Sequence, residues 1–139
     1  MGDTLDGSNT STWSQTKMYL VINALENLVT QLAGHDGIVN VSLIGFGSTA
    51  TLSANISDLT SSNLSGLVDK ISHLAATGST NYESAFTTAT TWFASKPATG
   101  YENLTYFLTD GNPNATSSNS SVSAYTAMTT AETAFSSLS

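Results

Sequence analysis

The chain has 139 residues, of which 40% are hydrophobic and only 9% are charged, and its formal net charge is −7. This acidic balance excludes nucleic acid as a partner, because binding to a phosphate backbone needs a clustered basic surface. The absence of cysteine excludes disulfides and zinc–thiolate sites, and no apolar run approaches the ~20 residues of a membrane span.

The first half of the chain predicts two helices and a hairpin. Residues 1–12 are a polar loop rich in turn formers, and an amphipathic helix is predicted over residues 13–33, where apolar side chains recur at three- and four-residue steps. Residues 37–46 form an apolar, β-rich run typical of an inner strand, and residues 49–53 are expected to pair with it as a hairpin. The same helical spacing predicts a second helix over residues 61–74.

The second half of the chain continues the alternation of helix and strand. A third helix is predicted over residues 81–95, and Pro97 enforces its end. The run NLTYFLT at residues 103–109 predicts a second strong strand, and a weaker helix is expected over residues 121–138. The order of elements predicts an α/β fold, with a doubly wound, mainly parallel sheet flanked by helices in a single domain.

Two polar residues follow or precede these elements at positions where α/β folds carry function. Asp110 comes directly after the predicted strand, and Gly111 permits a sharp turn there. Thr80 offers a hydroxyl immediately ahead of the third helix. Each has a structural alternative: Asp110 as a turn or helix cap, and Thr80 as a helix N-cap, with Glu83 completing a capping box. Tyr82 is expected to be a packing residue.

The segments TGSTNYESA and FLTDGNPN, which place Thr80 and Asp110 thirty residues apart, together resemble two of the three loops of a known metal site. That site is the metal-ion-dependent adhesion site of von Willebrand factor A (VWA) domains. The sequences of the two segments are most similar to those of the VWA domains of large bacterial RTX-type adhesins. The resemblance implies that Thr80 supplies a hydroxyl and Asp110 a carboxylate to a divalent cation, directly or through water. Mg²⁺ is the expected ion, with Ca²⁺ or Mn²⁺ as alternatives.

The third loop of that site has the pattern Asp-x-Ser-x-Ser at the end of the family's first, central strand. Asp6, Ser8 and Thr10 have a similar order of one carboxylate and two hydroxyls, and they are the weaker candidates for this loop because no strand precedes them. The favoured interpretation of these residues is a solvated loop, with Met1 matching the Met that follows the family motif. By this resemblance, residues 1–139 are a partial VWA domain that lacks the first central strand and the last strands.

The resemblance implies a binding module and not an enzyme. The expected function is metal-dependent adhesion by an exported bacterial surface protein, whose partner is a protein or surface ligand that presents a carboxylate to the metal. Two alternatives stay open: a Mg²⁺-dependent α/β hydrolase of the phosphoryl-transfer type, and a fragment that binds no metal. The hydrolase needs a second acid or a lysine near Asp110, whereas the lysines all lie in or at the ends of predicted helices: Lys17, Lys70 and Lys96.

Overall fold

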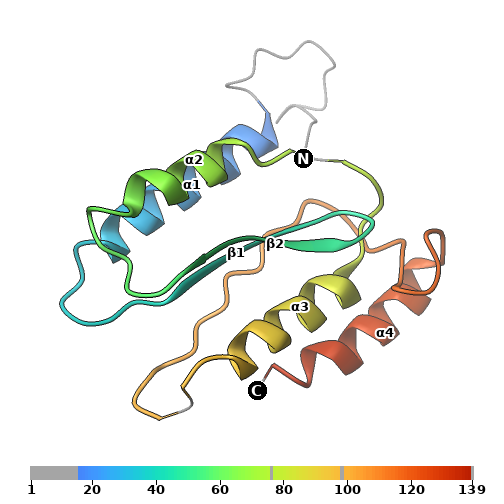
Figure 1. The fold of residues 1–139 in the computed structure, drawn as a ribbon. Helices are drawn as coiled ribbons and strands as arrows, with labels where there is room; N and C mark the ends of the chain where they lie inside the picture. The colour runs from blue at the N-terminus through green and yellow to red at the C-terminus, as the bar shows by residue number, and fades with distance from the viewer. Residues whose placement is uncertain (1–15, 76, 98, 139) are drawn as a thin grey trace. The chain divides into compact units, whose positions relative to one another are not determined.

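The computed structural model describes residues 16–75, 77–97 and 99–138, which contain four helices and one two-stranded sheet (Figure 1). In chain order the elements are α1 (Lys17–Leu32), β1 (Val41–Phe46), β2 (Ala50–Ile56), α2 (Leu64–Ser72), α3 (Tyr82–Ala94) and α4 (Ala124–Phe135). The described residues divide into two compact units, the first formed by residues 16–43 and 53–75 and the second by residues 44–52 and 77–138.

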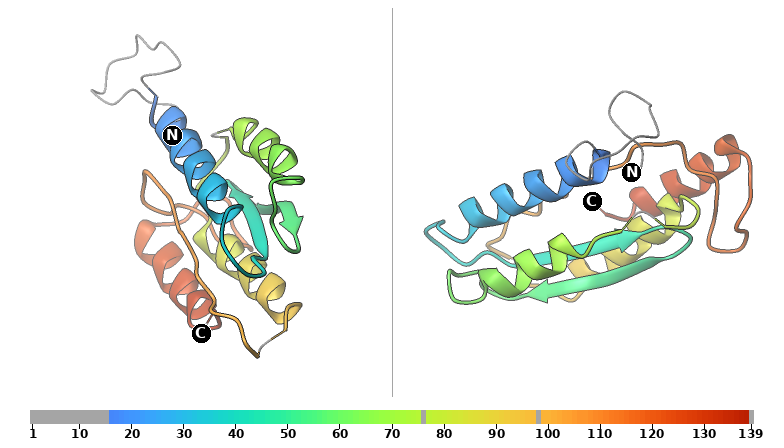
Figure 2. Two further views of the ribbon diagram at one scale, coloured as in Figure 1. Left: turned by 90° about the vertical axis from the view of Figure 1, so that its left-hand side faces the viewer. Right: turned by 90° about the horizontal axis from the view of Figure 1, so that it is seen from above.

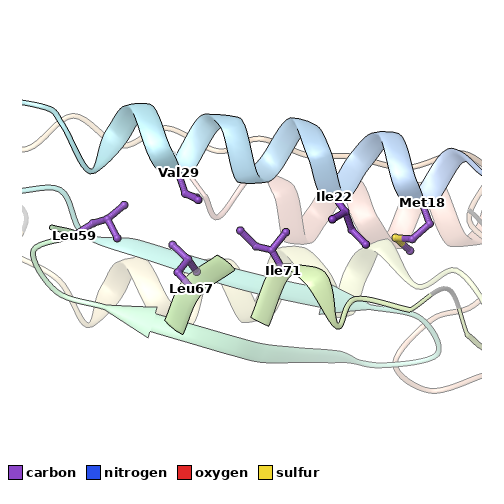
Figure 3. Packing of buried hydrophobic residues seen from close by; sticks show 6 residues of the cluster. All are labelled: Met18, Ile22, Val29, Leu59, Leu67 and Ile71. Carbon is purple, nitrogen blue, oxygen red and sulfur yellow. The ribbon is translucent and has the colours of Figure 1, made fainter. Parts of the chain in front are cut away.

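The first unit is built around α1 and α2, which lie side by side (Figures 1 and 2). Its helix α1 begins after Thr16, whose hydroxyl accepts a hydrogen bond from the backbone N–H of Tyr19 at 3.1 Å and so caps the helix. Figure 3 shows the apolar side chains that meet between the helices and the chain after β2. Each such side chain stabilises the unit by about 1.5–3 kcal/mol when fully buried. The cluster consists of Met18, Ile22, Val29, Leu59, Leu67 and Ile71.

The second unit is built around α3 and α4, which also lie side by side (Figures 1 and 2). The buried positions of α4 are the alanines 127 and 131, and α3 buries Ala85 and Ala89. Alanine costs no side-chain entropy in a helix and has little bulk, so these positions let the two helices approach closely. Buried side chains of Tyr82 and Trp92 add larger apolar surface on α3.

The strands β1 and β2 form a hairpin, as predicted. They are joined by residues 47–49, where the backbone N–H of Gly47 donates to the carbonyl of Thr49 at 2.9 Å. Strands joined by so short a turn are antiparallel, since a parallel pair needs a long crossover connection. The sheet of the described residues is therefore an antiparallel pair, and the mainly parallel sheet that the sequence predicts is not found in them.

The predicted strand at residues 103–109 is wrong for the described structure, in which this segment has no strand assignment. Its apolar composition favours a strand, but a strand forms only where a neighbour supplies the ladder hydrogen bonds and the packing of side chains. The described sheet contains only β1 and β2. The large side chains of this segment accordingly remain exposed, with Leu104 at 69% and Tyr106 at 58%.

Candidate functional site

Thr80 lies just before α3, but it does not cap that helix. The N-cap is Asn81, whose side-chain oxygen accepts a hydrogen bond from the backbone N–H of Ser84 at 3.0 Å. The carboxylate of Glu83 accepts from the backbone N–H of Ser117 at 2.7 Å, so it does not close a capping box. The capping alternative for Thr80 is therefore wrong. Among the described residues Thr80 hydrogen-bonds through its backbone alone, so its hydroxyl is uncommitted.

Asn81 joins the start of α3 to the turn of the hairpin. Its side chain is 0% exposed, and its amide nitrogen donates to the carbonyl of Ser48 at 3.0 Å, while its backbone N–H donates to the carbonyl of Gly47 at 2.9 Å. The two turns also approach closely, since the backbone N–H of Ser79 donates to the hydroxyl of Ser48 at 3.0 Å. Gly78 has φ 76°, a conformation that favours glycine. The segment that carries Thr80 is thus held from both sides of the residue.

The loop that carries Asp110 is hydrogen-bonded to the segment of Thr80. The side-chain oxygen of Asn114 accepts from the backbone N–H of Thr80 at 2.7 Å, and the backbone N–H of Asn114 donates back to the Thr80 carbonyl at 3.0 Å. The N–H of Ala115 reaches the same carbonyl at 3.3 Å. The structure therefore brings together the two loops that the sequence singled out, within the second compact unit.

A tyrosine from α3 holds the turn at Asp110. The hydroxyl of Tyr82 donates to the carbonyl of Gly111 and lies 3.0 Å from the hydroxyl of Thr109. These two residues flank Asp110, whose own side chain lies on an exposed bend. The Tyr82 ring is buried and meets Phe107 edge to face, with ring centroids 4.9 Å apart. The position of the turn is therefore coupled to the aromatic packing of α3.

The described residues supply one carboxylate and one uncommitted hydroxyl to the candidate site. These are hard oxygen ligands of the kind that Mg²⁺ prefers, so the pair fits such an ion, although six ligands are needed in all. Within residues 16–75, 77–97 and 99–138 no group of three or more His, Asp or Glu side chains could hold a metal ion. The candidates for the third loop, Asp6, Ser8 and Thr10, lie outside the described residues.

The chain also matches a known protein family over most of its length. The profile of the von Willebrand factor type A domain matches residues 4–112, which include both Thr80 and Asp110. The chain belongs to the VWA family. Domains of this family are generally protein-interaction modules, many of them dependent on a divalent cation, and the VWA fold is of the α/β class. No curated protein and no solved structure matches the chain.

Two residues that hold the candidate site together were not singled out as functional from the sequence. Tyr82 was expected to serve in packing, which it does, but its hydroxyl also bonds the turn around Asp110. Asn114 is the last residue of the segment FLTDGNPN, but it was given no role of its own. Contacts of this kind join residues about thirty positions apart, and local sequence patterns do not contain them.

In the described part of the VWA chain, no helix has the length and apolar character to cross a bilayer.

Proposed function

We propose that this VWA chain is a metal-ion-dependent adhesion module of an exported bacterial surface protein. In this proposal Thr80 and Asp110 hold a divalent cation, Mg²⁺ before Ca²⁺ or Mn²⁺, and the cation binds an acidic group of a protein or surface ligand. The observation that carries the proposal is the reciprocal pair of hydrogen bonds between Thr80 and Asn114, which keeps the two candidate loops together.

The chemistry of the two side chains suits such a role. The hydroxyl of Thr80 is uncommitted among the described residues, because Asn81 serves as the helix cap in its place. Asp110 lies on an exposed bend and brings a single negative charge. A cation held by one carboxylate and neutral oxygens keeps a net positive charge, and when bound it supplies a binding position for a carboxylate of the partner. Water is the further ligand we expect, and Asp6, Ser8 and Thr10 are the weaker candidates for the third loop.

Isothermal titration with Mg²⁺, Ca²⁺ and Mn²⁺ tests the metal site. We expect the wild-type chain to bind at least one ion, and Asp110→Ala and Thr80→Val to weaken that binding by about tenfold or more. Thr80→Val keeps the shape of the side chain and removes only the hydroxyl. The matched control is Asp36→Ala, which removes an exposed carboxylate from the first unit and should bind as wild type does. Wild-type affinity in Asp110→Ala would contradict the assignment of this ligand.

Binding of an acidic partner needs a second assay. We expect the chain to bind an immobilised peptide that contains Asp or Glu in the presence of the preferred cation, and to release it when EDTA removes the metal. A peptide with Asn and Gln in place of the acids is the control. Binding that persists in EDTA would show that the partner is not held through a metal. The export part of the proposal depends on the likeness to RTX-type adhesins, and surface labelling of the source cells tests it.

A further inference from the structure

The hydroxyl of Tyr82 has a specific place in the candidate site. It bonds the residue before Asp110 and the residue after it, Thr109 and Gly111, but it is not itself a candidate ligand. The ring beneath it is buried and packs edge to face with Phe46 and Phe107, at centroid distances of 6.0 and 4.9 Å. The packing of a buried tyrosine ring also fixes the position of the hydroxyl at its end.

We infer that Tyr82 is the positioning residue of the proposed metal site, acting by fixing the turn of residues 109–111 that carries Asp110. The inference rests on the proposed function for its metal readout. The turn is exposed, and an exposed turn carrying a carboxylate samples several positions unless its backbone is tied down. Tyr82 begins α3 two residues after Thr80, so one stretch of chain holds the proposed hydroxyl ligand and also orients the carboxylate ligand.

Tyr82→Phe isolates the role of the hydroxyl. The substitution keeps the ring and its contacts with the surrounding aromatic side chains, and it removes only the bonds to Thr109 and Gly111. Gly111 is exposed, so water can satisfy its carbonyl after the substitution. The matched control is Tyr106→Phe, since the side chain of Tyr106 is 58% exposed.

Two measurements test the inference on the full chain. The first is amide hydrogen exchange without metal, where we expect the amides of residues 110–112 to exchange about two- to tenfold faster in Tyr82→Phe, as the loss of one or two modest hydrogen bonds implies. The second is titration with Mg²⁺, where we expect the dissociation constant to rise by a similar factor. Combined with Asp110→Asn, Tyr82→Phe should weaken the residual Mg²⁺ binding by a smaller factor than it does alone, whereas a merely structural loss would weaken both by the same factor.

The outcomes separate this inference from the proposed function. Unchanged exchange at residues 110–112 in Tyr82→Phe overturns the positioning role, whatever the metal data show. Wild-type Mg²⁺ affinity in Tyr82→Phe, together with lost affinity in Asp110→Asn, also overturns it and leaves the metal site intact. If the wild-type chain binds no cation, the proposed function fails, and faster exchange in Tyr82→Phe but not in Tyr106→Phe still supports the hold of Tyr82 on the turn.

Discussion

Asn81→Ala removes two hydrogen bonds from a fully buried side chain, and we expect it to destabilise the second unit strongly. The loss of the helix cap on Ser84 costs about 1 kcal/mol. The carbonyl of Ser48 then loses its partner from the amide of Asn81, which costs about 1–3 kcal/mol if no water replaces it. Together the free energy of unfolding should fall by about 2–4 kcal/mol.

Guanidinium unfolding followed by circular dichroism measures this loss, and two further variants divide it between the two bonds. Asn81→Ser keeps a good capping oxygen on a shorter side chain, so it should recover the cap contribution but not the bond to Ser48. Asn81→Asp keeps the cap but replaces the amide donor with a buried negative charge facing a carbonyl, so we expect a loss as large as that of Asn81→Ala. A loss below about 0.5 kcal/mol in Asn81→Ala, or wild-type stability in Asn81→Asp, would refute this reasoning.

Two other predictions concern packing. Leu67→Ala empties a site that is 1% exposed in the core of the first unit and should cost about 2–5 kcal/mol, whereas Leu52→Ala, at a side chain 40% exposed, should cost much less in the same unfolding assay. Gly47→Ala places a methyl group 2.3 Å from the backbone oxygen of Thr77 and should lower the melting temperature, while Gly66→Ala, in open space on α2, should stabilise the chain by about 0.5–1 kcal/mol. The reverse order of the two glycine variants would contradict the close approach of the turns.

The helices were the part of the fold that the sequence predicted best. All four were predicted, those at residues 13–33 and 61–74 from the spacing of apolar residues, and each is a little shorter in the structure than predicted. This signal is local, because one face of a helix is specified by residues three and four positions apart. The hairpin was predictable for the same reason, as both of its strands and the turn between them lie within residues 41–56.

The strand at residues 103–109 and the cap of α3 show where local patterns fail. A strand needs a neighbouring strand, which can come from anywhere in the chain. An apolar, β-rich run therefore indicates only a preference for the strand conformation. The alternative that made Thr80 the cap was wrong by one residue, since Asn81 caps the helix and both side chains can accept the bond. Asn81 has in addition an amide donor that reaches Ser48, and a threonine at this position has none to offer. The long-range bond therefore favours asparagine as the cap.

Three consecutive residues at the start of α3, residues 80–82, each make a different contact that holds the candidate site together. The backbone of Thr80 binds Asn114, the side chain of Asn81 binds the hairpin turn, and the hydroxyl of Tyr82 binds the turn around Asp110. A hydroxyl that is to bind a cation must keep its lone pairs uncommitted, so its position has to be fixed by other groups. The capping and bridging bonds of its neighbours meet that requirement, since they hold Thr80 without using its side chain. The residues beside the proposed ligand are therefore constrained by their own hydrogen bonds, although they are not themselves proposed as ligands.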